Sequence, residues 1–251
     1  MALESTAHER VDATAVYAVV GRSSRMITTL AWLALEVKYL DRAEAFYRDH
    51  LELETVAERD DEIALAVDDT DLVLRRPTAL PRGGLHTHYA YSIPAAEYDA
   101  WYDRLAETFA LDERTFGSSR SLYFYDTEGN CVELGESDES GTGVLGVFEV
   151  VLEVADLDRA EAFYTALGME PVDRGGDRRR VRLDAGPFAL ELWEPQLGIA
   201  DARGGVHVDC GFGVEDSEAA LERVQDRVSA VERTDERIRV RDPDGHFLTF
   251  V

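Results

Sequence analysis

The chain contains an internal repeat. Residues 35–47 read LEVKYLDRAEAFY and residues 152–164 read LEVADLDRAEAFY, so eight consecutive residues are identical at an offset of 117. Later in each copy, DTEGN at 126–130 corresponds to DPDGH at 242–246. Because self-similarity at a fixed offset indicates repeated structural units, we predict two tandem modules, residues 28–137 and 144–251. The acidic, Gly- and Ser-bearing residues 138–143 form the linker between them.

Residues 1–27 show no clear hydrophobic period, and we predict that they form a mobile N-terminal extension. Met26 directly precedes the first expected strand, so an over-long gene prediction is the alternative explanation of this segment.

The hydrophobic pattern predicts the same element order in both modules. Each module contains a half-buried strand, a helix and three strands, and then repeats that order. We expect Asp41 with Glu44, and Asp158 with Glu161, to cap the first helix of each module. The second helix of each module is predicted over residues 95–109 and 217–231. The chain is therefore expected to be an α+β protein built from four βαβββ units.

The composition is strongly acidic. The 251 residues include 51 Asp and Glu against 26 Lys and Arg, a formal net charge of −25, and Lys38 is the only lysine. Acid spread along a whole chain is typical of a halophilic cytoplasm, where salt screens the repulsion; an ordinary acidic mesophile protein is the alternative. Such a surface repels nucleic acid and anionic membranes, so we expect neither as a partner. No apolar run is long enough to cross a bilayer, and no secretory signal is visible, which predicts a cytoplasmic protein.

The two LEVxxLDRAEAFY segments and the two later endings, DTEGN with Glu133 and RDPDGHFLTF at 241–250, resemble the vicinal oxygen chelate superfamily. This superfamily contains glyoxalase I, extradiol dioxygenases and bleomycin- and fosfomycin-resistance proteins. The two-module layout is most similar to its catechol 2,3-dioxygenase-like branch. The resemblance implies that the units curl into cup-like mixed sheets, and that a divalent metal lies where two units face each other.

The resemblance also implies which positions hold the metal. Ligands come from the first and last strand of each unit, and the corresponding residues here are Trp32, Val73, His88, Glu133, Glu149, Glu191, Asp209 and Thr249. If each module closes its own cup, the candidate ligands are divided between two cups. If units exchange between modules, one cup collects His88, Glu133, Glu149 and Glu191. The other cup then has Trp32, Val73, Asp209 and Thr249, and we expect it to bind no metal.

We favour the exchanged arrangement because it concentrates the candidate ligands in one cup. The predicted metal ligands are then His88, Glu133, Glu149 and Glu191, with Fe²⁺ or Mn²⁺ favoured and Zn²⁺ or Ni²⁺ as alternatives. About a fifth of the chain is acidic, so a glutamate at such a position can also be an ordinary solvated side chain. His88 is the one candidate ligand that the high content of acidic residues does not explain.

Two candidate residues, Tyr123 and Glu149, indicate which reactions to consider. Tyr123 lies ten residues before Glu133, where the extradiol motif places a tyrosine that hydrogen-bonds a bound phenolate. The segment 114–120 lacks the histidine of that motif, and one His with several Glu differs from the usual two-His-one-carboxylate iron site. A glyoxalase I-like lyase or isomerase, with Glu149 or Glu191 as the base, is therefore the alternative. Non-catalytic binding of a small molecule is a third.

We expect a small-molecule substrate with vicinal oxygens, and a monomer or homodimer. The run Arg178–Arg180 is interpreted as a solvated strand edge.

Overall fold

The computed structural model describes residues 26–76, 86–176, 179–195 and 208–251, so the predicted extension lies almost entirely outside the described residues. The first half of the chain contains β1 (Ile27–Glu36), α1 (Leu40–Leu51), β2 (Glu54–Arg59), β3 (Glu62–Val67) and β4 (Thr70–Arg75), followed by β5 (His86–Pro94), the 3-10 turn η1 (Ala95–Glu97), α2 (Tyr98–Ala106), β6 (Asp112–Phe116), β7 (Ser119–Tyr125) and β8 (Cys131–Ser137).

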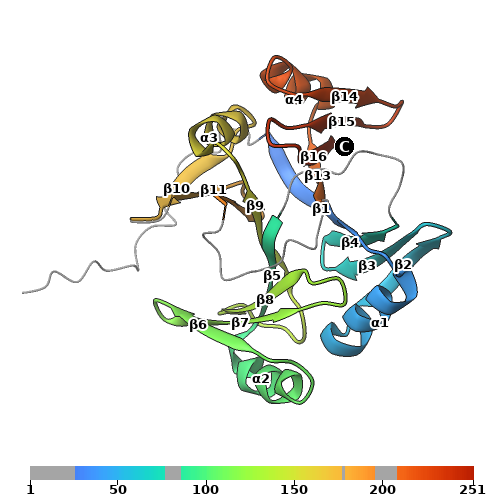
Figure 1. Cartoon of the computed structure of the whole chain (residues 1–251), viewed down its shortest axis with the longest axis vertical. Coiled ribbons are helices and arrows are strands. Elements are labelled where there is room, and N and C mark those ends of the chain that lie inside the picture. The colour runs from blue at the N-terminus through green and yellow to red at the C-terminus, as the bar shows by residue number, and fades with distance from the viewer. Residues whose placement is uncertain (1–25, 77–85, 177–178, 196–207) are drawn as a thin grey trace, which may run out of the picture.

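The second half repeats this order. It contains β9 (Gly146–Glu153), α3 (Leu157–Ala166), β10 (Glu170–Arg174), β11 (Arg180–Asp184) and β12 (Ala189–Trp193), followed by β13 (Val208–Val214), α4 (Ser217–Val224), β14 (Ala230–Arg233), β15 (Ile238–Arg241) and β16 (Phe247–Phe250). The predicted α+β fold of four βαβββ units is thereby confirmed (Figure 1).

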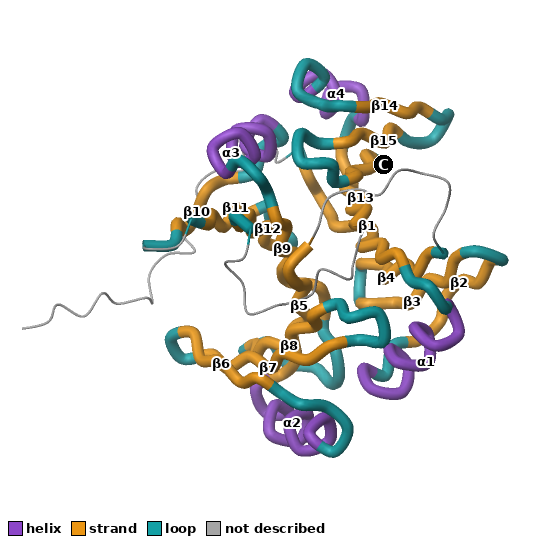
Figure 2. Tube along the Cα trace, in the orientation of Figure 1, coloured by secondary structure: helices purple, strands orange, loops and turns teal. Residues whose placement is uncertain are grey.

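The strands form two eight-stranded sheets, and each sheet draws on both halves of the chain. One has the order β14-β15-β16-β13-β1-β4-β3-β2 and the other β10-β11-β12-β9-β5-β8-β7-β6. The halves meet through the antiparallel pairs β1–β13 and β5–β9. Figure 2 shows the helices on the outside of the curled sheets, with β5 and β9 side by side. This is the exchanged arrangement expected from the distribution of candidate ligands.

The ends of three helices differ from prediction. Helix α3 starts at Leu157, and Asp156 is its cap, accepting a hydrogen bond from the Arg159 amide, so Asp158 lies in the first turn. In α1 the same position is Tyr39, which gives no side-chain cap. Helix α4 ends at Val224 rather than 231, because residues 230–233 pair with β15 as an edge strand. Strand pairing there outweighs the helical period.

A repeated tyrosine–carboxylate contact joins the two sheets. Tyr47 on α1 donates a 2.8 Å hydrogen bond to Asp126, which follows β7, and Tyr164 on α3 donates one of the same length to Asp242, which follows β15. All four residues are buried. In each case the partners belong to one half of the chain, but the helix with the tyrosine connects strands of one sheet and the aspartate follows a strand of the other.

Candidate metal centre

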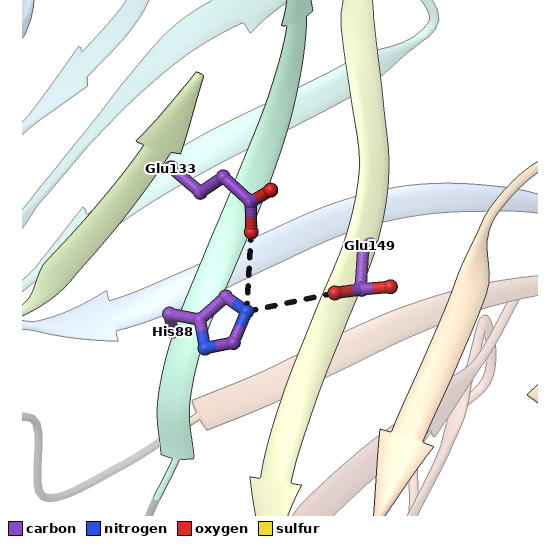
Figure 3. A group of neighbouring side chains, drawn as sticks. All are labelled: His88, Glu133 and Glu149. Carbon is purple, nitrogen blue, oxygen red and sulfur yellow. Dashed lines mark ion pairs between the residues drawn. The ribbon is translucent and has the colours of Figure 1, made fainter. Parts of the chain in front are cut away.

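The centre of the second sheet brings three predicted ligands onto one face. Ala90 on β5 is in register with Glu133 on β8 and with Glu149 on β9. Residues paired across strands, and residues two apart along a strand, have side chains on the same face. His88, two residues before Ala90, therefore lies between the two glutamates, and Figure 3 shows its ring directed at both carboxylates.

The three side chains are close and almost completely buried. His88 Nε2 lies 3.2 Å from Glu133 Oε2 and 3.5 Å from Glu149 Oε1. One ligand atom from each residue lies within 4.8 Å of the others, and the side chains are only 3%, 5% and 6% exposed. Two buried carboxylates this close need a positive charge between them. One imidazole nitrogen with carboxylate oxygens is a donor set that suits a divalent transition metal, so these residues fit the metal implied by the resemblance.

The surroundings keep Glu133 ionised. Burial alone raises the pKa of Glu133, but the contact with His88 and hydrogen bonds from Ser121 and Tyr123 outweigh burial and lower the pKa below its ordinary value. The pKa of Tyr123 is raised, first by burial and then by the Glu133 charge. Tyr123 therefore stays protonated at neutral pH. Its ring lies edge-on to His88, with 5.6 Å between the centroids.

Glu191 lies on the same face but is held by other partners. Its Oε2 accepts a 2.6 Å bond from Trp193 Nε1, and its Oε1 lies 3.1 Å from Arg180 Nη1 and 3.3 Å from Arg182 Nη1. Arg182 also contacts Glu149. Glu191 is therefore not one of the three clustered residues, and its assignment as a metal ligand stays a prediction.

Arg180 was expected from the sequence to be part of a solvated edge, which differs from the structure, and Arg182 was not singled out. The side chain of Arg180 is 23% exposed and that of Arg182 31%, and the pairing of Arg182 with Glu191 places both on the cup face. Arg179 is 62% exposed and pairs with Glu194, as expected for a solvated edge, while Arg178 lies outside the described residues. The alternation of Arg180 and Arg182 with Val181 and Leu183 is the signal that distinguishes them.

The corresponding cup of the first sheet is filled by its own side chains. Trp32 packs over Ala34, Ala64 and Val73, and also lies so close to Gly211 that a Cβ there would be 2.2 Å from the indole. The remaining two predicted positions bond to each other, since Thr249 donates a 3.0 Å hydrogen bond to Asp209, whose other oxygen lies 3.2 Å from Arg75. In the described part of the chain, His88, Glu133 and Glu149 form the one cluster suited to a metal.

The sequence and structure comparisons both find proteins of the glyoxalase and dioxygenase type. Residues 146–250 match the family model of the Glyoxalase/Bleomycin resistance protein/Dioxygenase superfamily, and no curated protein matches the chain. A proposed dioxygenase from Bacillus subtilis is structurally similar, with a TM-score of 0.70 and 17% identity, over 90% of this chain and 86% of that one. Glyoxalase I from Zea mays gives a TM-score of 0.64 and 17% identity over 88% and 91%. A single-residue variant of the maize enzyme has a TM-score of 0.68 and 16% sequence identity, over 88% of this chain and 92% of that one.

The chain therefore has the two-module glyoxalase-like fold, and its second half matches the superfamily in sequence as well. At these identities the likeness to the solved structures concerns the fold alone. No helix in the described ranges is both long and apolar enough to cross a membrane.

Proposed function

We propose that the whole chain is a vicinal oxygen chelate enzyme, which uses a divalent metal to act on a small molecule with two neighbouring oxygens. The observation that carries this proposal is the buried cluster of His88, Glu133 and Glu149. A purely structural role for two adjacent buried glutamates is disfavoured, because apolar residues in the same place would avoid the cost of burying their charges. The same cost disfavours a metal-free binding protein.

When bound, a divalent metal supplies a Lewis acid that orients and polarises the two substrate oxygens. His88, Glu133 and Glu149 would hold it, and Glu191 is proposed as a fourth ligand that has to leave its arginine partners to reach the ion. Fe²⁺ or Mn²⁺ is favoured for this mixture of one imidazole and several carboxylates, with Zn²⁺ or Ni²⁺ as alternatives.

The first candidate reaction is extradiol-type ring cleavage of a catechol. Tyr123 supports it, because this residue is buried beside His88 and its raised pKa keeps a hydroxyl proton that can be donated to a substrate oxygen. To do so, Tyr123 has to exchange its hydrogen bond to Glu133 for one to the substrate.

The second candidate is a glyoxalase I-like lyase or isomerase, and the two carboxylates around His88 favour it. In that reaction Glu149 accepts a proton from the substrate carbon next to a carbonyl and returns it to the neighbouring carbon. Its contact with Arg182 places a positive charge beside the Glu149 carboxylate.

Two measurements test the proposal. The protein is purified without chelator and its metal content is determined; about one divalent ion per chain supports the proposal, and less than about a tenth contradicts it. The iron-loaded protein is then mixed anaerobically with catechol and exposed to oxygen. A yellow ring-opened product supports cleavage, whereas turnover of a hemithioacetal without that product supports the isomerase.

We also propose a setting for this activity. A net charge of −25 with a single lysine favours a salt-rich cytoplasm, and a small molecule rather than nucleic acid or a membrane as the partner. Because both cups are completed within one chain, the monomer can be active, and a homodimer is the alternative.

A further inference from the structure

Arg182 has one half of its guanidinium engaged and the other half available. Its contacts with Glu149 and Glu191 both use Nη1. A guanidinium has five N–H donors, and Nε and Nη2 together form a fork that matches the two oxygens of a carboxylate. Within the described part of the chain this fork has no partner, and the side chain is 31% exposed, so solvent reaches it.

The position of Arg182 places this fork next to the proposed metal. Arg182 contacts Glu149, and Glu149 Oε1 lies 3.5 Å from His88 Nε2. The guanidinium is therefore only one carboxylate away from the ligand cluster. A molecule that binds the metal through two oxygens would have the adjacent part of its skeleton within reach of Arg182.

The charges in the metal-loaded cup balance, so the cup does not repel an anion despite the acidity of the protein. Glu133, Glu149, Glu191 and the partner of Arg180, Asp173, carry four negative charges. Arg180, Arg182 and a divalent ion offset all four. Without the arginines the loaded cup would remain negative by two charges and would repel an anionic ligand.

The unit β1–β4, which corresponds to β9–β12 in the repeat, lacks these two arginines. In the first sheet the residue in the place of Arg182 is Ala64, which pairs with Val73 as Arg182 pairs with Glu191. In the place of Arg180 that sheet has Glu62. Arginine at these positions is thus not required by the repeated fold.

We propose that the Nε/Nη2 fork of Arg182 is an anion subsite that binds a carboxylate group of the substrate beside the metal. This inference rests on the proposed function, since the substrate is expected to bind the metal through its vicinal oxygens. It narrows the substrate class to acids that carry two neighbouring oxygens and, separately, a carboxylate. Glu149 contacts Nη1 through Oε2 while its Oε1 faces His88, so it holds the guanidinium in place even when Glu191 has left Arg182 for the ion. The fork is therefore oriented before the substrate binds.

The test compares two probes that differ only in this group, catechol and protocatechuate, which is catechol with one added carboxylate. Calorimetry is performed under anaerobic conditions on protein loaded with Mn²⁺, after the metal content has been measured. We expect protocatechuate to bind at least about tenfold more tightly than catechol, since a charge-assisted bidentate pair is a strong hydrogen-bonded contact. Arg182→Met should remove the preference, and Arg182→Lys, which keeps the charge but not the fork, should retain only part of it.

Arg179→Met is the matched control, because Arg179 precedes the same strand but points to solvent and pairs with Glu194. This variant should keep the full preference. Equal affinities in the wild-type protein, binding of neither probe by metal-loaded protein, or a preference that survives Arg182→Met would each overturn the subsite. A protein that takes up no metal would instead overturn the proposed function, and the metal measurement identifies that case separately.

Discussion

The hydroxyl of Tyr164 donates a 2.8 Å hydrogen bond to Asp242 Oδ2, and both residues belong to motifs that the chain contains twice. Tyr47 and Asp126 form the same contact in the first half of the chain. The two repeated motifs, far apart in sequence, are thus joined directly in space. Because each tyrosine lies on a helix that connects strands of one sheet and each aspartate follows a strand of the other, each pair links the two sheets.

Removing one of these hydroxyls should destabilise the protein. In Tyr164→Phe the buried Asp242 loses a donor, and we expect the free energy of unfolding to fall by about 1–3 kcal/mol in urea denaturation. Tyr91→Phe is the matched control, because the Tyr91 hydroxyl is buried with no hydrogen-bond partner among the described residues. That variant should be neutral or stabilising. A larger loss in Tyr91→Phe than in Tyr164→Phe would contradict the assignment.

The filled cup should depend on a glycine. A Cβ at Gly211 would lie 2.2–2.5 Å from three atoms of the Trp32 ring, so Gly211→Ala has to displace the indole from its place over Ala34 and Val73. We expect a destabilisation of about 1–3 kcal/mol, as for overpacking of a core. Gly176→Ala, where a Cβ meets nothing within 4 Å, should stay within about 0.5 kcal/mol of the wild type. Equal effects would argue against the packed cup.

Metal should bind in one cup only. We expect about one divalent ion per chain in the wild-type protein and in Asp209→Asn, because Asp209 already pairs with Arg75 and Thr249. His88→Ala should lower the affinity for the ion at least about a hundredfold and abolish activity. Titration with a fluorescent chelator measures the affinity. Two ions per chain, or full binding in His88→Ala, would place the metal elsewhere.

Stability should decline in alkali. Burial, followed by the charge of Asp126, raises the pKa of Tyr47, Tyr89 and Tyr91 well above the ordinary value, and burial with Asp242 does the same for Tyr164. The folded state therefore keeps these phenols protonated, whereas the unfolded chain releases their protons near pH 10. Their stabilising contribution is complete below about pH 10 and is lost as the pH rises further. Phenolate absorbance followed together with circular dichroism tests this; ionisation of all ten tyrosines in a protein with native dichroism would refute it.

Salt should stabilise the fold if the acidic surface is a halophilic adaptation. Raising the salt from about 0.1 M to about 1 M shortens the screening length from about 10 Å to about 3 Å. With a net charge of −25, repulsion between surface carboxylates should fall and the melting temperature should rise. Differential scanning calorimetry at the two concentrations measures this change. A melting temperature that is unchanged or lower in high salt would favour the ordinary acidic protein.

The repeat and the alternation of hydrophobic residues were enough to predict the four units. The exchange of units between sheets was predicted from the candidate ligands that the resemblance implies, because exchange collects them in one cup. His88, Glu133 and Glu149 come from separate strands, and they were grouped because the resemblance implies ligands at these positions and the exchanged arrangement places them in one cup. The role of Asp156 as a cap was missed because the helix starts two residues earlier than the acidic pattern indicates. In α4 the sequence continues with a helical period, but a neighbouring strand provides the competing hydrogen bonds.

The environment of Glu191 could not be predicted in the same way. Its partners Arg180, Arg182 and Trp193 come from two strands whose register depends on the turn between them, 185–188. Only the strand register, with Arg182 opposite Glu191, shows that the charge of Glu191 is paired with arginine and is not exposed to solvent. In a chain with so many acidic residues, the charge pattern alone does not distinguish a paired glutamate from a solvated one.

Each sheet contains strands from both halves of one chain, so the two cups can differ in sequence. In a symmetric dimer of one-module chains every substitution appears in both cups, so a tryptophan that fills one would fill the other. Here a single polypeptide carries both, and Trp32 and Glu149 occupy equivalent places without affecting each other. One cup can therefore be packed with side chains that stabilise the fold, while the other keeps the charged residues proposed to bind metal and substrate.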